Sequence, residues 1–127
     1  MASLHKNLYP DSSYTNKQTI ELRTLDGVVK DIAMKENILI KMDVQGYEET
    51  VIAGGEATIK RATAIIIESS FQQLYEGQCL FDKLYDYFTS RGFKFVGFTE
   101  QIFSKTTGIP LYADSIFIKA DLVKAAF

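Results

Sequence analysis

Cysteine and histidine are almost absent from this chain of 127 residues. The single cysteine, Cys79, excludes an internal disulfide framework and a cysteine-based zinc site. The single histidine, His5, lies in a polar N-terminal stretch and is interpreted as a solvated tail residue. Because no histidine outside this tail could activate Cys79, nucleophilic catalysis by its thiol is not expected. One unpaired cysteine fits a reducing compartment, and we expect a cytoplasmic location.

Long apolar runs and clusters of basic residues are also missing. The longest apolar run, 64–67, is far shorter than the roughly 20 residues that cross a membrane. The first ten residues lack the apolar segment of a signal peptide. The net charge is −2, and lysine and arginine are scattered along the chain. We therefore expect no membrane contact and no nucleic-acid partner.

What the chain does contain is typical of one α/β domain. Hydrophobic residues make up 46% and charged residues 24% of the sequence, and its length suits a single domain over residues 1–127. Residues 1–18 are polar and loop-like. Alternating or continuous apolar stretches predict strands at 19–25, 38–42, 64–68, 93–98 and 115–119. Helical periodicity predicts helices at 27–35, 47–62 and 78–91.

Local signals refine these elements. Asp26 is the predicted N-cap of the first helix, and Gly92 the predicted C′ residue of the last one. Gly54 and Gly55 predict a bend or break within 47–62, because each glycine costs about 1 kcal/mol in a helix. Gln45 and Gly46 predict a tight turn. The uninterrupted isoleucines at 65–67 are typical of a parallel strand that is covered on both faces.

A carboxylate ends the strand at 38–42. Ligands of open α/β sheets bind beyond the carboxyl ends of the strands, so Asp43 is a candidate ligand-binding residue. It is equally a candidate cap that accepts N–H bonds from the following turn or helix. Lys41 alternates with Asp43 along the strand, which predicts that the two share a face and a charge contact.

A second carboxylate, Glu68, ends the strand at 64–68 and is a candidate acid or polar contact at the same sheet edge. A hydrogen-bonded strand end is the alternative. Glu48 falls in the first turn of a helix, where the helix dipole favours it, and Asp114 is interpreted as a turn cap. The spacing of these carboxylates is not diagnostic of a metal site, and none is predicted.

Four stretches together resemble the FkbM-type methyltransferases. They are RTLD at 23–26, LIKMDVQGYE at 39–48, IIIESSFQQLYEGQ at 65–78 and ADSIFIK at 113–119, so the resemblance spans residues 19–119. It implies an enzyme that uses S-adenosylmethionine to methylate hydroxyl oxygens of sugars or polyketides. It also implies a partial Rossmann-like sheet of the class I methyltransferase type, mixed parallel and antiparallel. The strand at 64–68 would lie between those at 38–42 and 115–119, with 93–98 at the far edge.

The part of such enzymes that binds the cofactor has no counterpart in the sequence. Family members carry earlier strands with a glycine-rich loop for the cofactor and an acid for its ribose. The glycines at 53–57 lie within a predicted helix and do not follow a strand. By this resemblance the chain is the C-terminal, acceptor-side half of the domain. S-adenosylmethionine is its cofactor by resemblance only, and we expect that the chain alone neither binds it nor catalyses methyl transfer.

The resemblance also assigns roles to individual residues. Asp43 and Glu68 would be catalytic. A hydroxylated acceptor would contact the polar residues that surround them in the motifs, namely Lys41, Gln45, Tyr75, Glu76 and Gln78.

Without the missing strands, the edge of the strand at 38–42 is expected to be exposed. Residues 19–25 could fold back onto it or reach a second copy, and we expect a homodimer through this edge. The alternative function is a stand-alone oligomeric α/β module for binding or assembly, derived from such an enzyme and without catalysis. A third possibility is a fragment without a function of its own.

Overall fold

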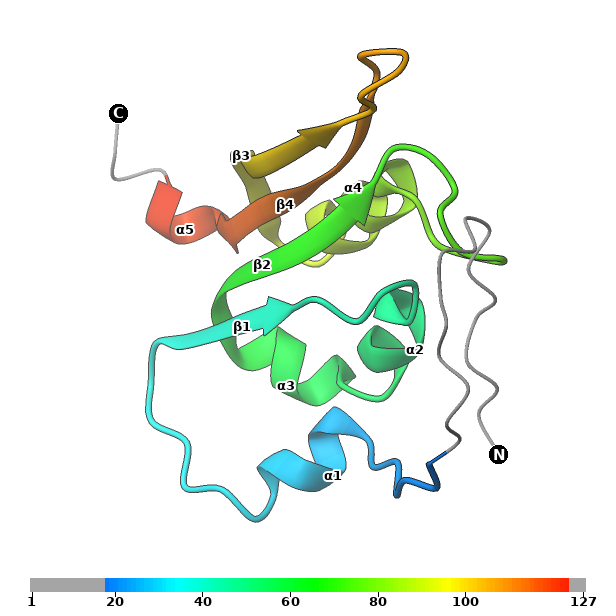
Figure 1. Ribbon diagram of the computed structural model, residues 1–127. Coiled ribbons are helices and arrows are strands. Elements are labelled where there is room, and N and C mark those ends of the chain that lie inside the picture. Colours follow the sequence, from blue (N-terminus) through cyan, green and yellow to red (C-terminus); the bar gives the residue numbers. More distant parts are fainter. Residues whose placement is uncertain (1–17, 124–127) are drawn as a thin grey trace.

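A computed structural model describes residues 18–123 as a four-stranded sheet with helices packed on it (Figure 1). The strand order is β1-β2-β4-β3. β1 pairs with β2 in parallel, while β2–β4 and β3–β4 are antiparallel. The expected mixed sheet and its neighbour order are confirmed. The strands are β1 (Ile38–Met42), β2 (Ala62–Ser70), β3 (Phe93–Phe103) and β4 (Pro110–Lys119).

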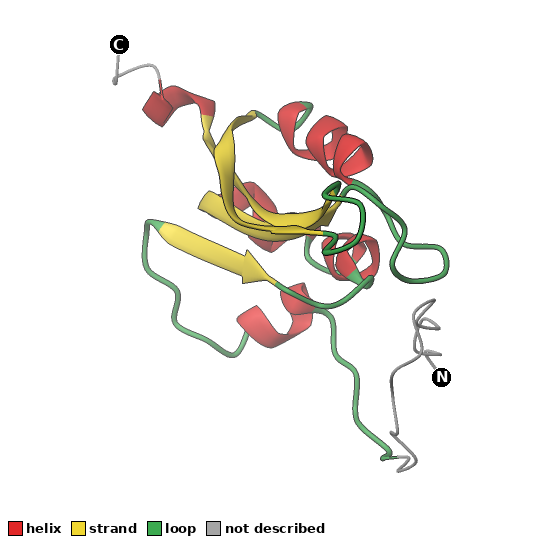
Figure 2. Ribbon diagram, turned by 45° about the horizontal axis from the view of Figure 1, so that its top comes forward, coloured by secondary structure: helices red, strands yellow, loops and turns green. Residues whose placement is uncertain are grey.

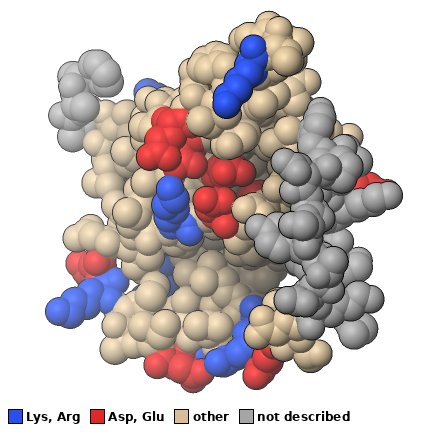
Figure 3. Space-filling model, in the orientation of Figure 1, with Lys and Arg blue, Asp and Glu red and all other residues tan. Residues whose placement is uncertain are grey.

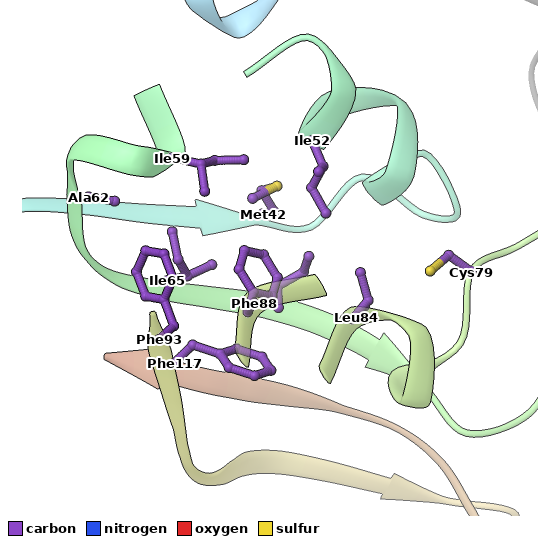
Figure 4. Packing of buried hydrophobic residues seen from close by; sticks show 11 residues of the cluster. Met42, Ile52, Ile59, Ala62, Ile65, Cys79, Leu84, Phe88, Phe93 and Phe117 are labelled. Atoms are coloured by element: carbon purple, nitrogen blue, oxygen red, sulfur yellow. The ribbon is translucent and has the colours of Figure 1, made fainter. Parts of the chain in front are cut away.

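Within residues 18–123, five short helices accompany the sheet, and Figure 2 shows helices and strands in different colours. Three of them, α2, α3 and α4, contribute Ile52, Ile59, Leu84 and Phe88 to one buried cluster. Alternate residues of β2, such as Ile65 and Ile67, are fully buried in the same cluster (Figure 4). The helices are α1 (Leu25–Val29), α2 (Glu48–Ala53), α3 (Glu56–Arg61), α4 (Phe81–Thr89) and α5 (Ala120–Val123).

The strand expected at 19–25 is wrong. Residues 18–24 form no helix or strand, and α1 begins at Leu25. The alternating pattern has no neighbouring strand among the described residues, and a strand without a ladder partner cannot form.

The prediction of Asp26 as the N-cap of the first helix is also wrong. Thr24 takes this position, and its Oγ1 accepts the N–H of Gly27 at 3.1 Å. Asp26 instead reaches α3, where its carboxylate accepts the N–H of Ala57 at 3.1 Å and of Thr58 at 2.8 Å. The Thr58 hydroxyl donates a further bond of 2.6 Å. Asp26 thus caps a helix 30 residues further along the chain and holds α1 against it.

The break predicted at Gly54 and Gly55 is confirmed, because α2 ends at Ala53 and α3 begins at Glu56. Both glycines are packed against α1. A Cβ on Gly55 would lie 2.8 Å from Leu25 Cδ2, and one on Gly54 would lie 3.2 Å from Thr24 Cβ. Their missing side chains therefore let α1 approach the α2–α3 junction.

The last long helix is shorter than its sequence pattern. α4 begins at Phe81 instead of residue 78, and Ser90 is its C-cap. Gly92 has a φ of +83°, the left-handed value expected of a terminating glycine, but it lies one position beyond C′. The predicted strands at 64–68, 93–98 and 115–119 are present, and each is longer than the predicted range. Among residues 18–123, no helix has the length and apolar character needed to cross a membrane.

Asp26 provides a test of how α1 is held. Hydrogen bonds from Thr58 keep the pKa of its carboxyl below the ordinary 3.8. A lowered native pKa stabilises the fold above pH 3.8, and this stabilisation is lost as the pH falls through the native value. We expect Asp26→Asn to lower the urea midpoint at pH 7 and the difference from wild type to close in acid.

Asp31→Asn is the matched control for this experiment, because the Asp31 side chain is 70% exposed and pairs only with Arg23 at the surface. It should leave the midpoint almost unchanged. An Asp26→Asn protein as stable as wild type at pH 7 would show that these hydrogen bonds do not fasten α1.

Candidate functional site

Four charged side chains meet where the parallel strands end. Lys41 and Asp43 come from the end of β1, Glu68 from β2 and Asp114 from β4. The register pairs Glu68 directly with Asp114, while Lys41 lies beside Ile66. The Nζ atom of Lys41 donates to Asp114 Oδ2 at 2.8 Å, a bond that crosses β2. On the face drawn in Figure 3, acidic side chains lie on both sides of a basic one over the sheet.

Asp43 is the accessible carboxylate of this group. Lys41 forms its direct bond with Asp114, which is the main reason that the pKa of Lys41 is raised, while the charge of Asp43 raises this pKa by a smaller amount, as the predicted charge contact implies. Asp43 is exposed and makes no hydrogen bond to another described residue. It does not cap α2, whose N-cap position is Tyr47. Its carboxylate therefore keeps its hydrogen-bonding capacity.

Glu68 has the most perturbed acidity among these carboxylates. It is half-buried, and loss of hydration is the largest cause that raises the pKa of its carboxyl from 4.5 to about 7. The negative charges of Asp43, Glu48 and Asp114 raise it further, while Lys41 lowers it. A carboxyl that titrates near neutrality can both take up and release a proton there.

The turn after β1 brings a buried carboxylate close to this group. Gln45 and Gly46 have φ values of +50° and +98°, which confirms the predicted tight turn. The Gly46 N–H donates to Glu48 Oε1 at 3.1 Å, within the first turn of α2. Glu48 is only 1% exposed, and its Oε2 has no hydrogen-bond partner among the described residues. Gly46 also has Tyr75 against it, since a Cβ there would lie 3.1 Å from Tyr75 Cβ.

The loop between β2 and α4 contributes Tyr75 to the site and uses Gln78 to hold itself. Tyr75 is half-buried, and the pKa of its hydroxyl is raised first by burial and then by Glu68 and Glu48. Gln78 is buried; its Oε1 accepts the N–H groups of Leu74 at 2.9 Å and Tyr75 at 3.3 Å. Its Nε2 donates to a β2 hydroxyl, Ser70 Oγ, at 2.7 Å. This amide therefore fixes the loop to the sheet.

The structure thus brings together some of the predicted site residues and separates others. Lys41, Asp43, Glu68 and Tyr75 lie around one end of the sheet. Gln45 and Glu76 are exposed in the flanking turn and loop, and the side chain of Gln78 is engaged within the protein. Direct contacts of these three with an acceptor stay predictions.

Asp114 is the member that sequence reasoning missed. It was interpreted as a turn cap because the last strand was expected to begin at residue 115, whereas β4 begins at Pro110. Extending the strand alternation backwards from Phe117 would have placed Asp114 in the strand, on the face opposite the buried Ser115 and Phe117.

Two features of the described residues bear on metal and nucleotide binding. In the described part of the chain, no group of three or more histidine, cysteine or acidic side chains could hold a metal ion. Gly54 and Gly55 face Thr24 and Leu25, so they leave no open backbone against which a nucleotide could lie. Cys79 is buried, and burial raises the pKa of its thiol to about 11, which opposes thiolate chemistry.

The fold and site are those of an α/β protein with a polar cluster at the carboxyl ends of its parallel strands. Comparison with protein families extends this description, because residues 2–95 match the methyltransferase FkbM domain. The chain belongs to the FkbM methyltransferase domain family, whose members use S-adenosylmethionine in general.

One curated relative supports the assignment. The chain is 39% identical over 74 residues to the 2-O-methyltransferase NoeI of Sinorhizobium fredii (strain NBRC 101917 / NGR234). The aligned region covers 58% of this chain and 30% of the relative, so the chain spans less than a third of that protein. No solved structure matches the chain.

Glu68 provides a test of the electrostatics. Because the native pKa of Glu68 is raised, its protonated form favours the folded state. This contribution to the free energy of unfolding is fully present below pH 4.5 and is lost as the pH rises through about 7. We expect Glu68→Gln to match the wild type in acid and to become more stable than it above pH 7. In NMR titration of the wild type, the Glu68 carboxyl should have its midpoint near 7.

Two further variants identify the cause of this shift. Asp43→Asn should lower the Glu68 midpoint because it removes the second-largest contribution, whereas Asp31→Asn, outside the cluster, should not. A Glu68 midpoint near 4.5 in the wild type would show that the carboxylates do not share one poorly hydrated site.

Proposed function

We propose that this chain supplies the acceptor side of an S-adenosylmethionine-dependent O-methyltransferase that acts on a hydroxyl group of a sugar or polyketide. The observation that carries the proposal is the meeting of Asp43, Glu68 and the Lys41–Asp114 pair at the carboxyl ends of β1 and β2. Ligands of open α/β sheets bind at this place. Membership of the FkbM family and likeness to a 2-O-methyltransferase support the same reaction class.

Each of the charged side chains has a role that suits a hydroxyl acceptor. Such a hydroxyl is far too weakly acidic to ionise unaided, so its proton needs a receiving base. Asp43 is exposed and has free lone pairs, so we assign it the role of accepting this proton at its carboxylate oxygens. Glu68 is the second proton carrier and becomes ionised only near neutrality. Lys41 is held by Asp114 and contributes positive charge beside both carboxylates.

The surrounding polar residues would orient the acceptor. Tyr75 presents a hydroxyl beside the carboxylates, and Gln45 and Glu76 are exposed in the turn and the loop next to it. Gln78 would not contact the acceptor directly, but it positions Tyr75 by fixing the loop that carries it. These groups orient and deprotonate an acceptor, while binding of the methyl donor requires residues beyond those described.

A second candidate function is an oligomeric α/β module for binding or assembly, without catalysis. The packing of α1 against Gly54 and Gly55 favours it, because glycines that might cradle a nucleotide serve a helix contact instead. The two functions differ in whether a hydroxylated acceptor binds at the site.

Acceptor binding is therefore the first measurement. We expect methyl glycosides with vicinal hydroxyls to shift amide NMR signals of residues 41–46 and 68–70. Asp43→Asn should weaken this binding by about tenfold, because hydrogen bonds to charged groups contribute about 1.5–3 kcal/mol. Asp86→Asn, exposed on α4, is the control and should bind as wild type does. Equal binding by Asp43→Asn and wild type, or shifts confined to other residues, would contradict the proposal.

Activity of the isolated chain is the second measurement. Incubation with labelled S-adenosylmethionine and a panel of sugars should give no label transfer above a boiled control, because the donor cannot be positioned by the acceptor side alone. Label transfer that is lost in Asp43→Asn would show that the chain is a complete enzyme.

A further inference from the structure

The sheet has two edge strands among the described residues, β1 and β3, and the shorter and more apolar of them is β1. Within this part of the chain, β1 pairs only with β2. Its Leu39 side chain lies on the face opposite the buried Met42 and is 60% exposed. Main-chain N–H and C=O groups along such an edge readily pair with another strand, and natural proteins rarely leave them open.

Residues 18–24 have the pattern of a strand but pair with no strand among the described residues. Ile20 and Leu22 alternate with polar residues and are each 63% exposed. No backbone hydrogen bond joins residues 18–23 to another described residue. The segment runs away from the sheet in Figures 1 and 2, while Asp26 holds the following helix α1 on α3. The same chain therefore offers an unpaired edge and an unpaired strand sequence that do not meet.

The apolar residues of the two stretches match in a parallel alignment. With residue 20 beside residue 40, Ile20 lies next to Ile40 and Leu22 next to Met42. Met42 belongs to the buried cluster and Ile40 packs against it. An added strand in this register would extend the core face with two further apolar side chains, now exposed.

The charged residues select this register over its antiparallel alternative. The same parallel alignment places Glu21 beside Lys41 and Arg23 beside Asp43, so both neighbouring pairs have opposite charges. The antiparallel alignment that keeps Glu21 beside Lys41 places Arg23 beside Leu39 instead. Neighbouring pairs of opposite charge stabilise strand pairing, and like pairs oppose it.

We propose that two copies of this chain exchange residues 18–24, each segment adding to the other copy's β1 as a parallel strand in this register. Exchange of identical segments gives a closed two-fold dimer in which the β1 edge of each copy is paired. It also brings Arg23 of the partner subunit to Asp43, so the second copy contributes a positive charge to the candidate site. The proposal does not depend on catalysis, since the pairing uses only the edge and the segment.

Sedimentation equilibrium of the full chain at micromolar concentration tests the assembly. We expect a dimer of the 14.3 kDa chain. Arg23→Glu should raise the dimer dissociation constant by about tenfold, because it replaces attraction by repulsion at two symmetric places. Combining Arg23→Glu with Asp43→Arg should restore dimerisation. A monomer at all concentrations would overturn the proposal.

Asp31→Asn is the matched control. In the monomer Arg23 pairs with Asp31 at 3.0 Å, and this variant removes that pair without touching the proposed edge. It should dimerise as well as wild type or better. Weakening of the dimer by Asp31→Asn equal to that by Arg23→Glu would show that the intrachain pair matters instead.

Cysteine cross-linking tests the register. Thr19 and Leu39 are exposed and would lie side by side, so mixed Thr19→Cys and Leu39→Cys proteins should form an intermolecular disulfide on oxidation. The native Cys79 is buried and does not compete. Cross-linking of Leu39→Cys with itself would indicate β1–β1 pairing, and cross-linking of Leu39→Cys with Arg23→Cys an antiparallel segment. Either of these two results would overturn the register, and no cross-link at all would overturn the exchange.

These measurements contain no acceptor and no methyl donor. Loss of dimerisation with acceptor binding retained would therefore overturn the strand exchange alone. Dimerisation without acceptor binding would leave the exchange standing and overturn the proposed acceptor site.

Discussion

The rest of the structure depends on β2, which pairs with neighbours running in opposite directions. Its alternate side chains Ile65 and Ile67 are fully buried against the helices, and this burial fixes which face each neighbouring residue takes. A shift of one residue would place Glu68 in the core. The burial of two isoleucines therefore also decides that Glu68 meets Lys41 and Asp114 on the other face. Core and site are specified by the same register.

Much of the fold followed from the sequence, for identifiable reasons. The strands at 38–42 and 64–68 are compact apolar runs. The break at Gly54 and Gly55 was predictable because glycine is unfavourable inside a helix. The prediction failed where long-range contacts decide. Residues 19–25 have a strand pattern but no strand beside them, and the partner of Asp26 lies 32 residues away at Thr58. Such contacts leave no local signal.

The candidate site shows the same division. The positions of Asp43 and Glu68 at strand ends were predictable, because strand ends can be read from apolar runs. The partner of Lys41 was not, because Asp114 is 73 residues away and its strand begins earlier than its apolar core. Tyr75 was expected at the site only through family resemblance, and its closeness to Glu68 depends on how Gln78 folds the loop.

The anchoring of this loop by Gln78 has a consequence for how the exposed surface of the loop could change. The buried amide ties Leu74 and Tyr75 to Ser70, while Gln72, Gln73 and Glu76 remain exposed. Substitutions at these exposed positions would alter the surface at which we propose that an acceptor binds, without removing a hydrogen bond that holds the loop. Such a loop can diverge between related proteins while the scaffold beneath it stays constant.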